Sequence, residues 1–404
     1  MLLLSLCYSK SMTEFLYIHI PFCIRKCIYC DFLSVTYDEA YAKEYVDALC
    51  RELVLKKDSA GALKTIYIGG GTPSVLPEES FAQLFRIIRN NFEFSSEIEI
   101  TVEANPGTIN ESKIKTLLSA GTNRISIGAQ SFNDNELKTL GRIHSSEEAV
   151  KAIEMIKKAG LNNFSIDLMY GIPGQTMNSW KDTLSRAVGF SPKHISSYEL
   201  TPEKDTQLYN MIKPPPPLHS PLGCESYRLG KREVIKMPDE ELVLEMYNFA
   251  IDYLAHRGYE HYEISNFALQ GFRCIHNMNY WNRGEYIGAG AGAHSFINGV
   301  RSKSTGDIKK YIETLDNGII TETESMRLTR TDEIKEFIFL GLRKTEGINI
   351  TKAKELGLNI PDSCKGLIDE GYLGISGDYL GLTRKGIVIS NTIIVRIFEK
   401  LKLD

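Results

Sequence analysis

Six short β-branched runs alternate with longer amphipathic stretches between residue 15 and about residue 200, and this alternation limits the possible folds more than any other feature. Strand–helix units in series are typical of parallel strands joined by right-handed helical crossovers. The predicted strands cover residues 15–20, 64–69, 97–103, 123–129, 163–168 and 194–200. A doubly wound open sheet and an incomplete (β/α) barrel both satisfy this pattern. In either fold, functional residues follow the carboxyl ends of the strands.

The remaining segments differ from this α/β region in composition. Residues 1–14 are predicted to be a disordered extension, because their apolar run lacks the basic start and the cleavage site of a signal peptide, and Met12 is an alternative start. Residues 15–210 hold the six strand–helix units. Residues 211–237 form a proline-rich insertion, in which His219 and Cys224 are expected in a solvated loop. Residues 238–326 extend the α/β region and begin with a helix over 240–257. Residues 327–404 combine short helices with two short strands, YLGIS and YLGLT, which is typical of a winged-helix-like α+β domain.

Charge and hydropathy argue against two kinds of partner. A formal net charge of −4 gives no electrostatic reason to bind nucleic acid, and the expected recognition segment of the last domain carries Asp362, Asp369 and Glu370 against Lys365. We therefore expect that domain to act in protein docking or as a lid. No run of about 18 apolar residues occurs, so no transmembrane segment is predicted, and peripheral membrane contact stays open.

Three of the eight cysteines, Cys23, Cys27 and Cys30, lie within eight residues directly after the first predicted strand. The others are scattered, which indicates metal binding instead of a disulfide framework and predicts the reducing cytoplasm. Three thiolates on one loop can hold three irons of a [4Fe–4S] cubane and leave the fourth iron open to a small molecule. The alternative is a zinc site completed by His19 or another residue, but structural zinc favours C-x2-C pairs.

The C-x3-C-x2-C spacing after the first strand resembles the radical S-adenosylmethionine (SAM) superfamily. That resemblance implies a partial (β/α)6 barrel, a [4Fe–4S] cluster, and SAM bound through its amino and carboxylate groups to the open iron. A glycine triplet, GGGTP, follows the second strand, and polar side chains end the next strands, where they could cradle an adenosine and a carboxylate. The resemblance to the coproporphyrinogen-oxidase-like branch places SAM contacts at Tyr17, Tyr29, Gly70, Gly71, Thr72, Glu103, Gln130, Arg142 and Asp167.

Two features distinguish subgroups within this branch. Oxygen-independent coproporphyrinogen III dehydrogenases typically carry another cysteine two residues after the third, where this chain has Phe32. The segment CIHNMNYW at residues 274–281 is similar to the HN…YW motif of the HemW family of haem chaperones. His276 or Cys274 could ligate haem iron, and Tyr280 and Trp281 offer flat faces to the macrocycle. The alternative is that these aromatic residues pack against the barrel and His276 bonds locally.

The leading hypothesis is therefore a haem chaperone that binds haem, a [4Fe–4S] cluster and SAM, with no catalytic residue assigned. The resemblance implies an acceptor protein for the haem, in particular a respiratory enzyme. One alternative is the oxygen-independent coproporphyrinogen III dehydrogenase, which performs radical oxidative decarboxylation. Another is a radical SAM enzyme with an unrelated substrate, in which the HN…YW segment is structural.

Overall fold

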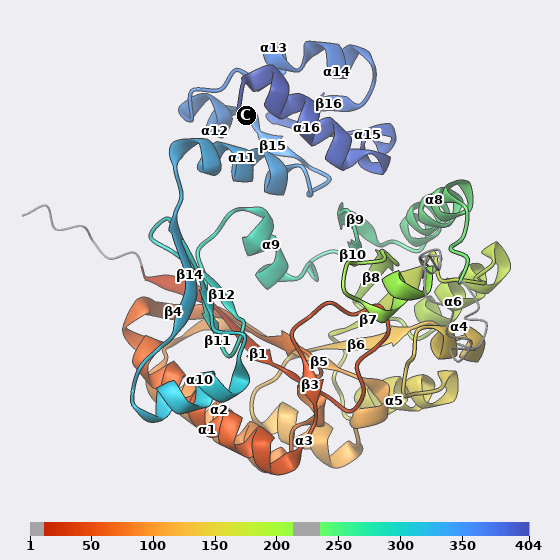
Figure 1. Ribbon diagram of the computed structural model, residues 1–404. Coiled ribbons are helices and arrows are strands. Elements are labelled where there is room, and N and C mark those ends of the chain that lie inside the picture. The colour runs from red at the N-terminus through yellow and green to blue at the C-terminus, as the bar shows by residue number, and fades with distance from the viewer. Residues whose placement is uncertain (1–11, 213–234, 404) are drawn as a thin grey trace, which may run out of the picture.

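The structure is a computed structural model that describes residues 12–212 and 235–403 (Figure 1). Most of the predicted N-terminal extension lies outside the described residues. So does most of the proline-rich insertion, including His219 and Cys224.

All six predicted strands are present, each within a few residues of its predicted bounds. They are β1 (Thr13–Ile20), β4 (Ala60–Gly70), β5 (Phe94–Ala104), β6 (Arg124–Gln130), β7 (Phe164–Tyr170) and β8 (His194–Glu199). Every neighbouring pair among them is parallel. Nearly every position of the central strands β6 and β7 is buried or half-buried. This is typical of a parallel sheet, which is covered on both faces.

The strand order decides between the two predicted folds. Neighbours follow chain order from β1 through β8, so every right-handed crossover advances in the same direction. A doubly wound sheet would reverse direction at a switch point. Within the described part of the chain the two outermost strands, β11 (Ile287–Ala289) and β9 (Glu260–Glu263), do not pair with each other, so the barrel is incomplete.

Residues after 238 add three strands to this sheet that the sequence did not indicate. β11 runs parallel to β1 at one edge, and β10 (Asn266–Ala268) pairs antiparallel with β8 and with β9 at the other. A short parallel pair, β2 (Phe22–Cys23) and β3 (Val35–Thr36), brackets the cysteine loop. A separate antiparallel sheet contains β12 (His294–Ile297), β13 (Val300–Ser304) and β14 (Glu322–Arg327).

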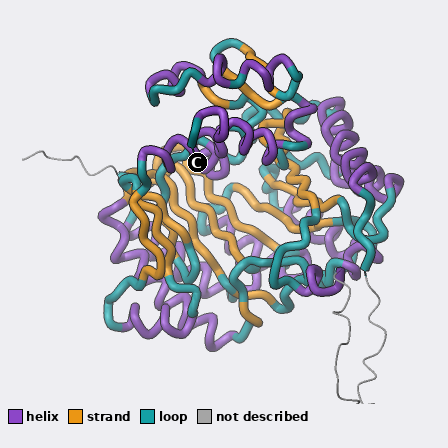
Figure 2. The backbone as a smooth tube through the Cα atoms, turned by 45° about the horizontal axis from the view of Figure 1, so that its top comes forward, coloured by secondary structure: helices purple, strands orange, loops and turns teal. Residues whose placement is uncertain are grey.

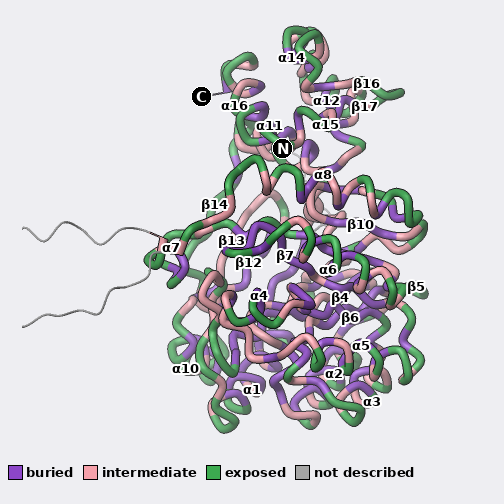
Figure 3. Tube along the Cα trace, turned by 90° about the vertical axis from the view of Figure 1, so that its right-hand side faces the viewer, coloured by how far each residue is buried: buried purple, intermediate pink, exposed green. Residues whose placement is uncertain are grey.

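Helices cover the outer face of the sheet (Figures 1 and 2). The larger ones are α1 (Glu39–Lys56), α2 (Glu78–Asn91), α3 (Glu111–Ser119), α5 (Ser146–Lys158), α6 (Met177–Gly189), α8 (Glu240–His256) and α10 (Ile308–Asp316). The short helices α4 (Asp134–Thr139), α7 (Gln207–Ile212) and α9 (Ile275–Trp281) lie in connecting segments. The predicted helix over 240–257 corresponds to α8. In α6, the fully buried Trp180 donates its indole N–H to the Met246 carbonyl at 2.9 Å and so joins α6 to α8. Buried residues are concentrated between the sheet and these helices (Figure 3).

The last part of the chain forms a small α+β unit above the barrel in Figure 1, as the winged-helix-like pattern predicts. Its helices are α11 (Arg330–Gly341), α12 (Ile350–Glu355), α13 (Ile360–Ser363), α14 (Lys365–Asp369), α15 (Arg384–Val388) and α16 (Ser390–Leu401). Its antiparallel sheet has the order β15 (Ile348–Asn349), β17 (Tyr379–Leu382), β16 (Leu373–Ser376). Ile338, Leu367, Leu380 and Ile393 belong to an apolar core that is separate from that of the barrel. None of the described helices is both long and apolar enough to cross a membrane.

Candidate cofactor site

The three predicted cluster ligands lie on one loop at the carboxyl end of β1 and line one cavity. Cys23 is buried, whereas Cys27 and Cys30 are half-buried. Among the described residues, no three His, Cys, Asp or Glu side chains are close enough to share one metal ion. In a cubane, by contrast, each thiolate binds a different iron. His19, the other candidate zinc ligand, has both ring nitrogens hydrogen-bonded, to the Tyr17 hydroxyl at 3.0 Å and the Leu33 carbonyl at 3.0 Å.

The glycine triplet lies directly against the cysteine loop. Gly70 has φ +114°, a conformation that residues with a Cβ rarely adopt. A Cβ at Gly71 would meet the Phe22 carbonyl oxygen at 2.8 Å and the Cys23 Sγ at 3.1 Å. Thr72 donates its N–H to the same Phe22 carbonyl at 2.8 Å, and its hydroxyl lies 3.5 Å from Cys23 Sγ. The triplet is therefore required for the close approach of two loops, which leaves its backbone beside the cysteines.

The cavity measures about 520 Å³, within the usual range for sites that enclose small molecules. Eight of the nine predicted SAM residues line it together with the cysteines: Tyr29, Gly70, Gly71, Thr72, Glu103, Gln130, Arg142 and Asp167. Tyr17 does not. Its ring instead stacks against Tyr67, a lining residue, at 6.3 Å between centroids. Gln130, the last residue of β6, has φ +64°, and non-glycine residues in that region occur mainly where the surrounding structure imposes them, often at functional sites.

Two opposite charges occupy this cavity close to the cysteine loop. Glu103 accepts a hydrogen bond from the Tyr67 hydroxyl at 2.8 Å and one from the Gly70 N–H at 3.3 Å. Burial raises the pKa of Glu103 to about 7, and the charge of Asp167 acts in the same direction. Arg142 donates to the Gly128 carbonyl at 2.7 Å and to Cys27 Sγ at 3.4 Å. A guanidinium here can pair with a ligand carboxylate while it also touches a cluster ligand.

Several polar residues that the sequence analysis did not name also line the cavity. They are Tyr67, Arg124, Ser126, His194, Ser196, Tyr198 and Asn277. Most occupy alternate positions on β6 and β8, so their side chains point to the same interior face. Ser126 donates to both oxygens of Asp167, at 3.0 and 2.9 Å, and helps to hold that carboxylate in place. Polar residues at every second position of otherwise apolar strands were the signal that could have identified them.

The HN…YW segment forms α9, whose histidine is internal. His276 is 1% exposed, and its Nδ1 lies 2.6 Å from the Thr65 hydroxyl while its Nε2 lies 2.9 Å from the Tyr280 hydroxyl. Its ring also stacks on Tyr67, with 5.2 Å between centroids. Burial lowers the pKa of His276 to about 3, and Arg124 contributes. Neither ring nitrogen is free to bind iron in this conformation.

The other residues of the segment have different surroundings. Cys274 is fully buried, burial raises its thiol pKa to about 12, and its Sγ lies 3.6 Å from a Glu99 carboxylate oxygen. Glu99 also accepts the N–H groups of Ile275 at 3.1 Å and His276 at 3.2 Å, which fixes the start of α9. At the other end of α9, Trp281 lines a second cavity. Thus α9 lies between two cavities, with Asn277 facing the first.

Comparisons with known proteins agree with this arrangement. A profile described as the radical SAM superfamily matches residues 17–187, and one described as the HemN C-terminal domain matches residues 328–389. The chain is 34% identical over 385 residues to "Heme chaperone HemW" of Bacillus subtilis, covering 93% of this chain and 97% of that protein. It is 34% identical over 395 residues to the protein of the same name from Escherichia coli, covering 94% and 96%.

Among solved structures, the chain resembles coproporphyrinogen III oxidase (HemN) from Escherichia coli, described as a radical SAM enzyme. The TM-score is 0.79 at 22% identity, and the match covers 96% of this chain and 90% of that one. At this identity the likeness shows a shared fold. The full-length similarity to the relatives above, together with the profile match, establishes that this chain belongs to the radical SAM superfamily and, within it, to the HemW family.

Proposed function

We propose that the protein is a haem chaperone that holds a [4Fe–4S] cluster with SAM and delivers haem to acceptor proteins. The observation that carries the proposal is the cavity in which three cysteines of one loop meet eight of the nine expected SAM residues. Haem as the cargo is supported by the name of the relatives, "Heme chaperone HemW". Phe32, which replaces the further cysteine of the dehydrogenases and is exposed, supports a chaperone over that enzyme.

Cys23, Cys27 and Cys30 hold the cluster in this proposal. When bound, the cluster supplies an open iron for the methionine end of SAM and a source of one electron. Arg142 pairs with the SAM carboxylate, the backbone of Gly70 and Gly71 binds the same end, and Thr72 contacts it. Glu103, Gln130, Asp167 and Tyr29 bind the remaining polar groups and the adenosine. Tyr17 contributes indirectly, since its ring supports Tyr67 from behind.

Haem contact is assigned to α9, with Tyr280 and Trp281 as the surfaces that meet the macrocycle. Trp281 lines the second cavity without any rearrangement. His276 and Cys274 remain ligand candidates, but each must first leave its buried partners, Thr65 and Tyr280 for the imidazole and Glu99 for the thiol. Axial ligation therefore requires α9 to move.

The remaining proposals concern organisation and partners. Residues 15–210 and 238–326 build the cofactor-binding barrel, residues 327–404 act as a docking or lid domain, and 211–237 are an insertion. The acceptors are respiratory proteins that receive haem in the cytoplasm, and contact with a membrane is peripheral, through such acceptors.

Nucleic acid is not a partner, since the last domain places Asp362, Asp369 and Glu370 against Lys365.

An oxygen-independent coproporphyrinogen III dehydrogenase is the second candidate. The observation that favours it is the polar lining beyond the SAM residues, Arg124, Ser196 and Tyr198, which could contact a substrate. The side chain of Arg124 is 2% exposed, and its Nε has no hydrogen-bond partner among the described residues.

One experiment separates the two candidates. The protein, reconstituted anaerobically, is titrated with haem and is separately assayed with coproporphyrinogen III, SAM and a reductant. A stable Soret band, haem transfer to an apo-acceptor and no protoporphyrinogen are expected, whereas turnover to protoporphyrinogen would overturn the chaperone assignment. Cys23→Ser should lose the visible absorbance of the cluster. Cys50→Ser is the matched control, because Cys50 is also buried but belongs to the barrel core.

A further inference from the structure

Tyr67 lies between α9 and the cavity beside the cysteine loop, which we call the SAM cavity. Its hydroxyl donates to Glu103 at 2.8 Å, and its ring stacks on His276 with 5.2 Å between centroids and 29° between the planes. Glu103 is a predicted SAM contact in the wall of this cavity, whereas His276 belongs to the HN…YW segment. One side chain therefore touches both motifs, although they are far apart in the sequence.

The neighbours of Tyr67 fix its ring against His276. Thr65 and Tyr67 point to the same face of β4, since alternate residues of a strand do so. The Thr65 hydroxyl lies 2.6 Å from His276 Nδ1, and the Tyr17 ring stacks on Tyr67 with 6.3 Å between centroids. Burial raises the pKa of Tyr67 well above its usual value, so its hydroxyl stays protonated and acts as a donor. A movement of this ring would therefore disturb the packing of His276.

The Glu103 carboxyl can respond to a ligand. Burial raises its pKa to about 7, so it is near half-ionised at neutral pH. SAM brings a sulfonium cation and donor hydroxyls into the cavity, and both favour the ionised carboxylate. A hydrogen bond to an ionised carboxylate is about twice as strong as one to a neutral group. Bound SAM should therefore tighten the contact between Tyr67 and Glu103.

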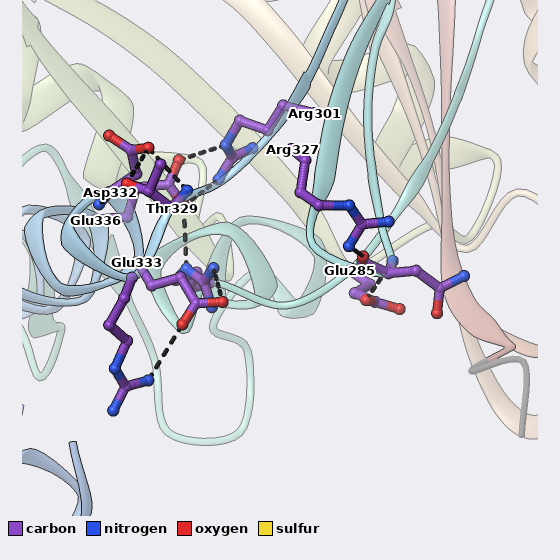
Figure 4. Close-up of polar contacts among 10 residues, drawn as sticks. Glu285, Arg301, Arg327, Thr329, Asp332, Glu333 and Glu336 are labelled. Carbon is purple, nitrogen blue, oxygen red and sulfur yellow. Dashed lines mark hydrogen bonds and ion pairs between the residues drawn. The ribbon is translucent and has the colours of Figure 1, made fainter. Parts of the chain in front are cut away.

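The contacts continue from His276 along α9 to the last domain, and Figure 1 shows α9 between that domain and the barrel. Nε2 of His276 lies 2.9 Å from the Tyr280 hydroxyl, one turn further along the helix. Directly after α9, Arg283 binds Glu336 of α11 at 3.0 Å, and Arg301 binds the same carboxylate (Figure 4). Thus α9 connects the interior of the barrel to the last domain.

We infer that Tyr67 is a positioning residue through which SAM, bound against Glu103, stabilises the packed conformation of α9. This inference rests on the proposed function and adds a coupling between the SAM cavity and the HN…YW segment. Such a coupling is reciprocal, so a change that loosens α9 must weaken SAM binding by the same factor. Without SAM, α9 leaves its packed position more readily.

Hydrogen–deuterium exchange of the cluster-loaded, full-length protein, followed by mass spectrometry of peptides that cover α9, tests the inference. Saturating SAM should slow exchange of the α9 amides about fivefold or more in the wild type. Tyr67→Phe keeps the ring but loses the bond to Glu103. This variant should bind SAM about three- to tenfold more weakly, and saturating SAM should slow α9 exchange less than about twofold.

Tyr259→Phe is the matched control for Tyr67→Phe. The Tyr259 hydroxyl likewise donates a hydrogen bond, to the Pro192 carbonyl at 2.7 Å, but the residue belongs to the barrel core. This variant should bind SAM, and slow α9 exchange on binding it, within about twofold of the wild type.

The reciprocal effect is measured with Thr65→Val, which removes the hydroxyl beside His276 from a fully buried position. In equilibrium dialysis this change should weaken SAM binding about threefold in the wild-type background. In the Tyr67→Phe background it should change SAM affinity by less than about 1.5-fold, because the connection is already lost. Circular dichroism melts show that each variant is folded.

The outcomes are distinct. Cluster-loaded wild type that binds no SAM contradicts the proposed function itself. SAM binding that leaves the exchange of α9 unchanged overturns the coupling alone. Equal slowing of α9 exchange in Tyr67→Phe and wild type, even at a lower melting temperature of the variant, would show that Tyr67 has only a structural role. An equal effect of Thr65→Val on SAM affinity in both backgrounds would also contradict the inference.

Discussion

Replacing Tyr280 by Phe separates a structural role of His276 from a role as a haem ligand. The Tyr280 hydroxyl lies 2.9 Å from Nε2 of the buried imidazole, and the Thr65 hydroxyl lies 2.6 Å from Nδ1. If the histidine is structural, Tyr280→Phe leaves one buried ring nitrogen without a partner. We expect this to lower the free energy of unfolding by about 1–3 kcal/mol with no gain in haem affinity.

The full truncation, His276→Ala, should cost more. It leaves the Thr65 and Tyr280 hydroxyls unpaired, at about 1–3 kcal/mol each, and it also removes the ring that stacks on Tyr67. The two hydroxyls alone sum to about 2–6 kcal/mol, and the lost ring packing adds to this cost. Loss of haem uptake in this variant would therefore follow from lost packing alone and would not identify an iron ligand.

Equilibrium urea unfolding of the cluster-free protein, followed by circular dichroism, measures both costs. His256→Ala at the exposed end of α8 is the control, and its effect should stay below about 0.5 kcal/mol. If His276→Ala has the same free energy of unfolding as the wild type, the imidazole does not make the buried hydrogen bonds described here. Tighter haem binding in Tyr280→Phe, whose Nε2 is freed, would identify His276 as a ligand.

Three further predictions concern charges. The folded-state pKa of Glu103 is raised to about 7, so its contribution to stability is present below about pH 4.5 and is lost as the pH rises through 7. Glu103→Gln should flatten this decline. The variant should therefore melt at a higher temperature than the wild type at pH 8 and at the same temperature at pH 4.5. Arg142→Gln removes the donor to Cys27 Sγ and should lower the reduction potential of the cluster in an EPR-monitored titration; an unchanged potential would contradict the contact. Glu336→Gln weakens the pair with Arg283 and should speed trypsin cleavage around residue 327 by about two- to fivefold, an effect that high salt reproduces in the wild type.

Local pattern was sufficient to predict most of the barrel. Most of the six central strands were found because each is a run rich in β-branched residues followed by an amphipathic helix. The choice between barrel and doubly wound sheet was left open because strand order is a long-range property that no local run encodes. β9, β10 and β11 were missed because strands of three or four residues, one of them within the glycine-rich IGAGAGA segment, have no detectable period.

The site residues could be predicted where their spacing, or their place directly after a strand, indicates their role. The cysteine spacing and the polar residues after strand ends indicated side chains that the fold then brings to one cavity. The surroundings of His276 could not be predicted, since its partner Thr65 is 211 residues away and its accessibility depends on how α9 packs over β4. Polar interior residues such as Ser126 and Ser196 were overlooked because each appears ordinary by itself.

Mössbauer spectroscopy of protein reconstituted anaerobically with isotopically enriched iron, recorded before and after addition of SAM, tests the central claim most directly. A cubane on Cys23, Cys27 and Cys30 has one iron without a protein ligand, so SAM should change about a quarter of the iron signal and leave the rest as it was. A spectrum that SAM does not alter, or a protein that binds zinc in place of iron and sulfide, would contradict it.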